Sequence, residues 1–477
     1  MKPLYMVLSM LAIGITSSAA MAEGASVPSA SLPNVSPANS DLVNRGAYIA
    51  RAADCMACHR EDYTGGTAIE TPMGDIYATN ITPSKRYGIG NYTEADLKNA
   101  LQKGRAPNHM LYPAMPYPSY NGMTDEDISA LFAYLQTVPA VDEKPEYETK
   151  LPFPFNFRFL MLGWNVLNLP ANENREGLSA TEQRGEYLVN NLAHCGTCHT
   201  PRNSTMGVDD SKYLAGAQLG TWHAPNITSD ESSGIGSWSE QDIVTYLRTG
   251  ELDQRVFAGG PMGEVVAHST RFLEDEDLGA IASYLKAVPA IQTDDKVNVA
   301  DVSSLKRPIN ESITHDLIAQ KDYLAQAKAN VDSSSPEGLY LAACGSCHGV
   351  DGYGQPDARY APIVGLSSIR RDNPASLINV ILHGVDGATN TSPIMPGFSD
   401  ELDSAQIADI SNYVRVNFGG LANSNVSAAD VDSVISPQDQ RPFLIKYAGI
   451  LATLGIIAVL LIIGLIIWNM VRKKRTH

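Results

Sequence analysis

The six cysteines of this 477-residue chain form three pairs with the same spacing. In each pair two residues separate the cysteines, and a histidine follows at once: Cys55-Met-Ala-Cys58-His59, Cys195-Gly-Thr-Cys198-His199 and Cys344-Gly-Ser-Cys347-His348. Two thiols so spaced can add to the vinyl groups of a porphyrin, and the histidine on the same helical turn can reach the iron. The pattern therefore predicts three covalently bound c-type haems, each with one histidine as an axial ligand.

Other chemistry is open to a single Cys-x-x-Cys motif. It can be a redox-active disulfide or one half of a zinc site. A redox disulfide does not need the histidine, and a zinc site would need a fourth ligand near each copy. Three complete copies, with no cysteine outside them, favour haem attachment.

The second face of each iron decides what a haem can do, because a second strong ligand favours electron transfer and an open face permits peroxide or gas chemistry. A methionine follows each motif within a Pro/Gly-rich stretch: Met115, Met262 and Met395. We expect these methionines to be the far-side ligands, presented by rigid non-helical loops. Histidines in the same stretches are the competing ligands: His109, His268 and His383.

The elements that must position these residues repeat along the chain. A helical pattern with Gly-x-Tyr precedes each motif, at Gly46-Ala-Tyr48, Gly185-Glu-Tyr187 and Gly338-Leu-Tyr340. A second helical pattern follows, at 128–135 with Tyr134, 278–285 with Tyr284 and 407–414 with Tyr413. The second copy opens with a capping box, Ser179-x-x-Glu182. Acidic residues at 125–127 and 275–277 suit the first turns of their helices.

This repeat resembles cytochrome c domains, in which the first and last helices cross with a glycine at the contact and an aromatic ring over it. We therefore expect Gly46, Gly185 and Gly338 to meet Tyr134, Tyr284 and Tyr413. The first two copies also share an insert, Ala78-Thr-Asn80-Ile81-Thr82 and Ala224-Pro-Asn226-Ile227-Thr228. The predicted fold class is all-α: three tandem cytochrome c domains plus a C-terminal single transmembrane helix. The expected boundaries are a signal peptide at 1–22, domains at 40–140, 178–290 and 335–420, linkers at 141–177 and 291–334, a tether at 421–446, a membrane helix at 447–471 and a cytoplasmic tail at 472–477.

The two ends of the chain indicate where it resides. Lys2, the apolar run from Leu4 to Ile15 and the sequence Ala20-Met21-Ala22 are typical of a cleaved signal peptide, with an uncleaved anchor as the alternative. The apolar stretch that starts at 447 is long enough to span a bilayer, and the basic cluster at 472–475 belongs on the cytoplasmic side. The sequence therefore predicts a single-pass protein of the inner membrane that lies mainly in the periplasm. The net charge of −17 argues against a nucleic-acid partner.

One linker is unusually aromatic. Four of the ten phenylalanines lie at alternate positions, Phe153, Phe155, Phe157 and Phe159, within the segment that ends at Trp164. Such a segment can simply pack onto its own domains, or it can contact a partner subunit or the membrane. The sequence leaves both interpretations open.

Taken together, the three motifs, the insert, the loop from Leu111 to Tyr120 and the Leu-Pro-Phe-Pro-Phe-Asn linker resemble the triheme cytochrome c subunit of membrane-bound dehydrogenases from acetic acid bacteria. The resemblance covers most of residues 40–420. That family serves alcohol, aldehyde, fructose and gluconate dehydrogenases. The resemblance implies that a separate catalytic subunit oxidises the substrate, and that this chain passes the electrons through its haems to ubiquinone in the cytoplasmic membrane.

By the same resemblance the chain is not an enzyme by itself, and a small third subunit is a further partner. Some relatives are anchored by amphipathic surface helices, so the spanning helix here favours the aldehyde, fructose and gluconate types over the alcohol type. Two other functions stay open from the residues alone. One is a peroxidase-like haem enzyme with one open iron, and the other is a cytochrome subunit that feeds a terminal oxidase.

Overall fold

The computed structural model describes residues 37–170, 175–253, 255–297, 317–354, 362–385, 394–436, 441 and 443–475. The predicted signal peptide lies outside these residues. The described chain is mostly helical, which confirms the expected fold class at that level. Its strands are two or three residues long and form four antiparallel pairs: β1 (Ala68–Ile69) with β2 (Ile76–Tyr77), β3 (Ala217–Leu219) with β4 (Trp222–Ala224), β5 (Glu251–Leu252) with β6 (Val256–Phe257), and β7 (Gly384–Val385) with β8 (Met395–Pro396).

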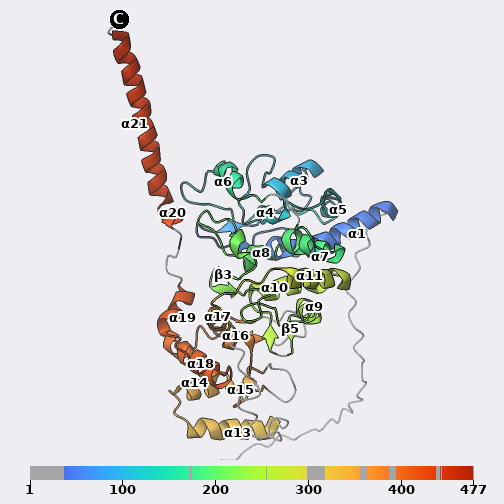
Figure 1. Ribbon diagram of the computed structural model, residues 1–477, viewed down its shortest axis with the longest axis vertical. Helices are drawn as coiled ribbons and strands as arrows, with labels where there is room; N and C mark the ends of the chain where they lie inside the picture. The colour runs from blue at the N-terminus through green and yellow to red at the C-terminus, as the bar shows by residue number, and fades with distance from the viewer. Residues whose placement is uncertain are drawn as a thin grey trace, which may run out of the picture.

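Three pairs of packed helices organise the part of the protein outside the C-terminal helix. The first pair is α1 (Pro37–Ala52) with α5 (Asp125–Leu135), the second is α7 (Ala180–Tyr187) with α11 (Asp275–Ala287), and the third is α14 (Pro336–Ala343) with α18 (Ser404–Asn417). The helical patterns expected downstream of the three motifs lie within α5, α11 and α18. Figure 1 shows the three pairs stacked in chain order along the long axis of the molecule.

Glycine permits the close crossing in the first two pairs. A Cβ atom on Gly46 would lie 2.0 Å from the carbonyl oxygen of Ala130 and 2.6 Å from Cβ of Tyr134. A Cβ atom on Gly185 would likewise lie 2.0 Å from the carbonyl oxygen of Ala280. The backbones therefore touch where no side chain could fit, as the sequence predicts for these two pairs.

The third pair differs from the first two at this glycine. The atoms nearest to a Cβ atom on Gly338 would belong to the backbone of Asp332 and Ser333, before α14, and not to α18. The aromatic contact comes instead from Tyr340, whose ring centroid lies 5.3 Å from that of Tyr413. Gly338 relieves a tight helix start, so the same Gly-x-Tyr motif serves a different purpose here.

The helix starts agree with the capping signals in the sequence. Ser179 and Glu182 form the predicted capping box at the start of α7, with the Ser179 amide donating to the Glu182 carboxylate over 2.7 Å. The acidic residues at 125–127 and 275–277 occupy the first turns of α5 and α11. Negative charge there is stabilised by the helix dipole.

The other described helices before α20 lie between and beside the pairs. They are α2 (Cys55–His59), α3 (Glu94–Lys103), α4 (Tyr117–Tyr120), α6 (Leu160–Asn168), η1 (Leu188–Leu192), α8 (Gly196–His199), η2 (Asp210–Lys212), α9 (Glu240–Thr249), α10 (Pro261–His268), η3 (Thr270–Phe272), α13 (Leu317–Asn330), α15 (Gly345–His348), α16 (Ser367–Arg370), α17 (Ala375–His383) and α19 (Ala428–Ile435).

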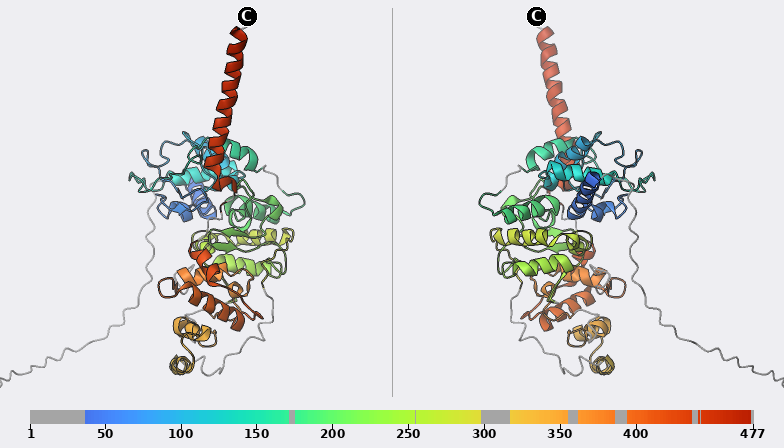
Figure 2. Two further views of the ribbon diagram at one scale, coloured as in Figure 1. Left: turned by 90° about the vertical axis from the view of Figure 1, so that its left-hand side faces the viewer. Right: turned by 90° about the vertical axis from the view of Figure 1, so that its right-hand side faces the viewer.

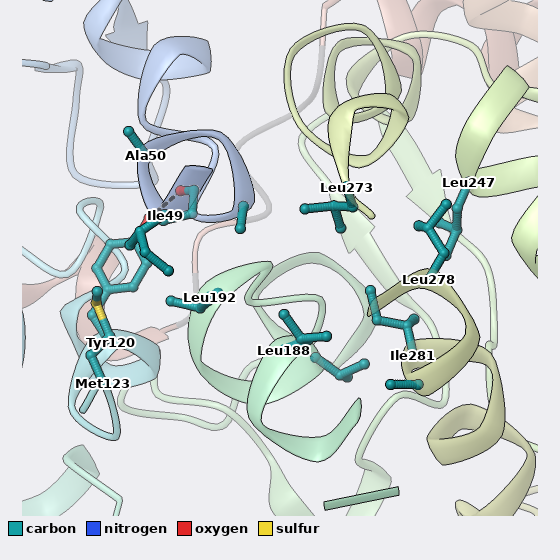
Figure 3. Packing of buried hydrophobic residues seen from close by; sticks show 14 of the residues in the cluster. Ile49, Ala50, Tyr120, Met123, Leu188, Leu192, Leu247, Leu273, Leu278 and Ile281 are labelled. Atoms are coloured by element: carbon teal, nitrogen blue, oxygen red, sulfur yellow. Dashed lines mark hydrogen bonds between the residues drawn. The ribbon is translucent and has the colours of Figure 1, made fainter. Parts of the chain in front are cut away.

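The first and second helix pairs share one hydrophobic core. Ile49 of α1 belongs to the same buried cluster as Leu192 of η1 and Ile281 of α11. Figure 3 shows Ile49 and Tyr120 on one side and Leu278 and Ile281 on the other, with η1 between them. The third pair has a separate core built on Leu341, Ile410 and their neighbours.

Crossed polar contacts also join the first two pairs. In the first two Gly-x-Tyr motifs, the tyrosine donates to an aspartate in the last helix of the other pair, over 2.5 Å for Tyr48–Asp277 and 2.6 Å for Tyr187–Asp127. Each aspartate also accepts from an arginine on the first helix of its own pair, over 2.7 Å for Arg184–Asp277 and Arg45–Asp127. We call these six residues the crossed triads.

The third pair attaches to the second through the segment after α11. The carboxylate of Asp295 accepts from Arg371 over 3.0 Å and from the amide of Asn373 over 3.1 Å. Part of the expected tether is folded, because Val431 and Val434 of α19 are buried in the core of the third pair. Burial of two valines explains why this stretch is helical rather than extended.

The C-terminus forms one long apolar helix. After the short α20 (Phe443–Lys446), α21 spans Ala448–Arg475, and its stretch Ala448–Arg472 contains an 18-residue window with a mean hydropathy of 3.2 and no buried residues. Length and composition allow this helix to cross a membrane. Figures 1 and 2 show α21 projecting away from the rest of the molecule at the end occupied by the first helix pair.

Candidate functional site

Each Cys-x-x-Cys-His motif lies on a single helical turn, as predicted. α2 comprises the first motif, whereas Cys195 and Cys344 cap α8 and α15, each of which ends at its histidine. The six cysteines are all described, and none forms a disulfide bond. In the residues that the structure describes, no three His, Cys, Asp or Glu side chains group together as a metal-ion site. The motifs thus offer two thiols and one imidazole on a short helix, which is the donor set that covalent haem needs.

The first two histidines are oriented by main-chain carbonyl groups. Nδ1 of His59 lies 2.6 Å from the carbonyl oxygen of Thr79, and Nδ1 of His199 lies 2.7 Å from that of Pro225. A carbonyl only accepts, so Nδ1 carries the proton and Nε2 keeps its lone pair. This tautomer suits a histidine that ligates iron through Nε2.

Both carbonyl groups belong to the repeated insert. Asn80 and Asn226, the next residues, are buried, and their side-chain oxygens accept from the amides of Thr82 and Thr228 over 2.8 and 2.9 Å. Their amide groups donate to the carbonyl oxygens of residues 141 and 291, beyond the last helix of each pair. The insert therefore fixes the hydrogen-bond acceptor of each histidine. The sequence shows that the insert is repeated but does not predict this role.

Burial controls the protonation of these groups. Loss of solvent is the largest influence on both histidines: it lowers the pKa of His59 and takes the pKa of His199 to about 4. Burial also raises the pKa of the Cys55, Cys195 and Cys344 thiols to about 12. The imidazoles are therefore neutral near pH 7, which a metal ligand requires. The thiols are not the low-pKa thiolates of a redox-active disulfide site.

The first and second motifs lie next to each other. The pKa of Cys58 rises to about 11, mainly because of burial. The charges of Asp54 and of Cys198, in the second motif, contribute further. Between the motifs, the ring of Tyr120 packs edge-on against His194 with centroids 5.6 Å apart, and its hydroxyl donates to the carbonyl oxygen of Ala53 over 2.7 Å.

The residues that precede the first two motifs are strained. Asp54 and His194 have positive φ angles of 50° and 40°, although neither is glycine. Such strain persists only where the surroundings impose it. It turns the chain sharply from the preceding helix into the motif, and both turns occur at the contact between the two pairs.

The three candidate methionines lie in different local structures. Met115 precedes α4 in a non-helical turn, as expected, and packs against the shared core. Met262 lies in the first turn of α10, so the expected non-helical loop is wrong there, because Gly260 with φ 52° and Pro261 start a helix. Met395 is in β8, paired with Val385. All three are partly buried.

The competing histidines differ in their exposure. His109 and His383 are exposed. His268 is half-buried and lies 3.2 Å from the carboxylate of Glu264 on the same helix.

The third motif lies in its own core. The Tyr340 hydroxyl donates to the carbonyl oxygen of Gly349, directly after His348, over 2.7 Å. Burial is the main reason that the pKa of Tyr340 lies well above its usual range. This motif lacks the insert that carries the hydrogen-bond acceptors of His59 and His199.

Comparisons with known proteins find relatives among the cytochromes. Residues 43–139 match the family model described as cytochrome c, and residues 332–414 match the model of the cbb3-type cytochrome c oxidase subunit III. The fructose dehydrogenase cytochrome subunit of Gluconobacter japonicus is 40% identical over 93% of this chain and 93% of its own length.

Two further relatives extend the similarity. The cytochrome c subunit of the quinone alcohol dehydrogenase of Gluconacetobacter polyoxogenes is 38% identical over 83% of this chain and 84% of its own length. The gluconate 2-dehydrogenase cytochrome c subunit of Pantoea cypripedii is 36% identical over 83% of this chain and 90% of its own length.

Proposed function

Because this chain belongs to the family of dehydrogenase cytochrome c subunits, we propose that it relays electrons from a catalytic dehydrogenase subunit through three c haems to ubiquinone. Family membership itself implies covalently bound haem c and electron transfer. The number of haems, their ligands, the quinone and the membrane topology are the proposed parts.

The observation that carries the proposal is the threefold occurrence of one donor set. Each haem would be attached through two cysteines: Cys55 and Cys58, Cys195 and Cys198, and Cys344 and Cys347. His59, His199 and His348 would ligate the irons on one face, and Met115, Met262 and Met395 on the other. Haem iron ligated in this way supplies reversible one-electron transfer. We correspondingly propose three cytochrome c domains at 40–140, 178–290 and 335–420; one family model matches residues 43–139, within the first, and another matches residues 332–414, which cover most of the third.

The protein contributes orientation and exclusion of water. The carbonyl oxygens of Thr79 and Pro225 accept a hydrogen bond from the Nδ1–H groups of His59 and His199 and so hold each ring in the ligating tautomer. Burial keeps both rings neutral. Tyr120 links Ala53 and His194, which lie just before the first two motifs, and this proximity supports a short path for electrons between the first two haems.

The proposed location is the inner membrane, with the folded body in the periplasm. A cleaved signal peptide at 1–22 would export the chain, α21 would span the bilayer, and the basic residues from Arg472 onward would stay in the cytoplasm. Of the three dehydrogenase types compared, the fructose type matches the largest share of the chain and is the first catalytic partner to test. A small third subunit is part of the same proposal.

Haem stoichiometry and ligation test the proposal. A pyridine haemochrome assay on the purified chain is expected to give three haems, and two or fewer would contradict it. Met115→Ala, Met262→Ala and Met395→Ala should each convert one haem to high spin in the optical spectrum. A high-spin haem in the unsubstituted protein would instead favour a peroxidase-like enzyme.

The identity of the partner distinguishes the remaining alternative. Gentle purification from membranes should recover a large dehydrogenase subunit whose substrate reduces the haems, and ubiquinone should reoxidise them. Recovery of copper-haem oxidase subunits in its place would mean that the chain feeds a terminal oxidase.

A further inference from the structure

The segment from Phe153 to Leu167, which we call the α6 surface, exposes apolar side chains to an unusual degree. Outside residues 443–475, seven of the thirteen exposed large apolar side chains in the described chain lie on it: Phe153, Phe157, Phe159, Leu160, Leu162, Val166 and Leu167. Val166 and Leu167 are 85% and 72% exposed. Contiguous exposed apolar surface of this kind marks a site of contact.

Apart from the exposed Asn156, the polar side chains of the same segment point toward the protein. Arg158 is the single charged residue between positions 151 and 170, and its guanidinium stacks 4.3 Å from the ring centroid of Tyr112 and donates to the carbonyl oxygen of Met110. The Trp164 indole donates to Thr205. A helix that hides its polar groups and exposes its apolar ones is the reverse of a water-facing helix.

The side chain of Asn165 follows the same rule. Its oxygen accepts from the Tyr117 hydroxyl over 2.7 Å, and its amide donates to the carbonyl oxygen of Lys103 over 3.0 Å. These bonds fix the rotation of α6 about its axis. The apolar face is therefore held outward by the fold and is not the result of a loosely attached helix.

The exposed residues of α6 form one stripe. Phe159, Leu162, Val166 and Leu167 follow the spacing i, i+3, i+7 and i+8, which places them on one helix face. Gly163 between them would have open space around an added Cβ atom. The stripe thus faces outward, away from the rest of the described chain.

The α6 surface lies beside the foot of α21. A Cβ atom on Gly449, in the first turn of α21, would lie 3.4 Å from the carbonyl oxygen of Phe153. Figures 1 and 2 show α6 at the end of the folded body from which α21 projects. The apolar surface is therefore continuous with the helix that would enter the bilayer.

We propose that the α6 surface inserts into the periplasmic leaflet of the membrane and holds the first helix pair, with its haem motif, against the bilayer. The inference rests on the proposed membrane span of α21. A lipid surface is the occupant that fits, because a body attached at Gly449 brings this stripe to the headgroup region wherever α21 enters. An apolar helix face with aromatic residues and no exposed charge partitions into that region.

Photolabelling of the full-length holoprotein tests the inference. The protein is reconstituted in nanodiscs of phosphatidylethanolamine and phosphatidylglycerol that contain a phospholipid with a diazirine on its acyl chain, and cross-linked peptides are mapped by mass spectrometry. Lipid adducts are expected on Leu162, Val166 and Leu167 and on α21. Peptides around Val416, which is exposed on α18 at a distance from α21, serve as the negative control.

The outcomes distinguish the membrane span of α21 from the insertion of the α6 surface. Absence of adducts on α21 would overturn the membrane span and, with it, this inference. Adducts on α21 without adducts on α6 would overturn this inference alone. Shielding of the α6 surface by a second copy or another subunit would appear as protein cross-links in place of lipid adducts, and would overturn it as well.

Charged variants give a second readout. Val166→Asp with Leu167→Asp should lower lipid adducts on α6 about tenfold, because a charge on a lipid-facing position is costly, while adducts on α21 stay unchanged. Val416→Asp should change neither. Equal labelling of α6 in the double variant and the parent would contradict insertion. Unchanged haem absorption shows that each variant is folded.

Discussion

The crossing of α7 and α11 makes Gly185 one of the least replaceable positions in the chain. In Gly185→Ala the new Cβ atom would start 2.0 Å from the carbonyl oxygen of Ala280, whereas carbon and oxygen normally approach to about 3.3 Å. Relief requires the helices to part by roughly 1.3 Å. Overpacking of this kind costs up to about 3 kcal/mol, and the gain from replacing a helical glycine returns about 0.5–1 kcal/mol. We expect a net loss of about 2 kcal/mol.

The assay is urea unfolding of the detergent-solubilised holoprotein, followed by far-ultraviolet circular dichroism. With an m-value of about 2 kcal/mol/M, the midpoint of Gly185→Ala should fall by about 1 M. Gly279→Ala is the matched control, because Gly279 lies in the partner helix and an added Cβ atom there has no neighbour within 4 Å. Its midpoint should stay or rise slightly. Equal midpoints for the two variants would refute the argument from helix crossing.

Three further substitutions test the contacts between the first two pairs and around the second motif. Although burial is the largest influence on the pKa of Asp277 and raises it, the bonds from Arg184 and Tyr48 bring it below its usual value. The bonds therefore stabilise the fold above pH ~4, and this stability is lost as the pH falls through the folded-state pKa. Asp277→Asn should lower the free energy of unfolding by about 2 kcal/mol at pH 7 and by less in acid. The control Asp275→Asn, at an exposed ion pair, should lower it by well under 1 kcal/mol at either pH. A loss in Asp277→Asn that does not depend on pH would contradict this reasoning. Asn226→Ala should lower the free energy of unfolding by about 2 kcal/mol and shift the reduction potential of one haem, because the insert no longer fixes the acceptor of His199. A spectroelectrochemical titration measures the potential. An unchanged potential would show that the insert is only structural. Tyr120→Phe should cost about 1 kcal/mol in a urea titration, because the buried carbonyl of residue 53 loses one donor and keeps its bond with His194. An unchanged midpoint would show that the hydroxyl adds no stability.

Local chemistry made much of this molecule predictable from its sequence. The motif helices, the capping box at Ser179 and the glycine contacts at Gly46 and Gly185 depend on short patterns whose physical reason is contained within a few residues. The third copy misled because Gly338 stands in the same motif but is needed for a tight helix start. Pro261 likewise turned an expected loop around Met262 into a helix.

The features that escaped prediction depend on long-range geometry. Tyr48 meets Asp277 across 229 positions, and nothing near either residue identifies the other as its partner. The acceptors of His59 and His199 are main-chain carbonyl groups, which carry no side-chain identity to read. The run of aromatic residues in the sequence indicates that the α6 surface is apolar. Its outward orientation depends on hydrogen bonds between distant residues, which the sequence does not predict.

The crossed triads have a further consequence. In each triad the same residue types perform the same roles with the two pairs exchanged, which is how a two-fold, isologous dimer interface is built. Here that interface is contained within one chain, as expected of two duplicated and fused copies that kept their dimer contact. The first two helix pairs are therefore a single evolutionary and mechanical unit. The natural point at which to shorten this chain, or to exchange a module between relatives, lies after α11 and not between α5 and α7.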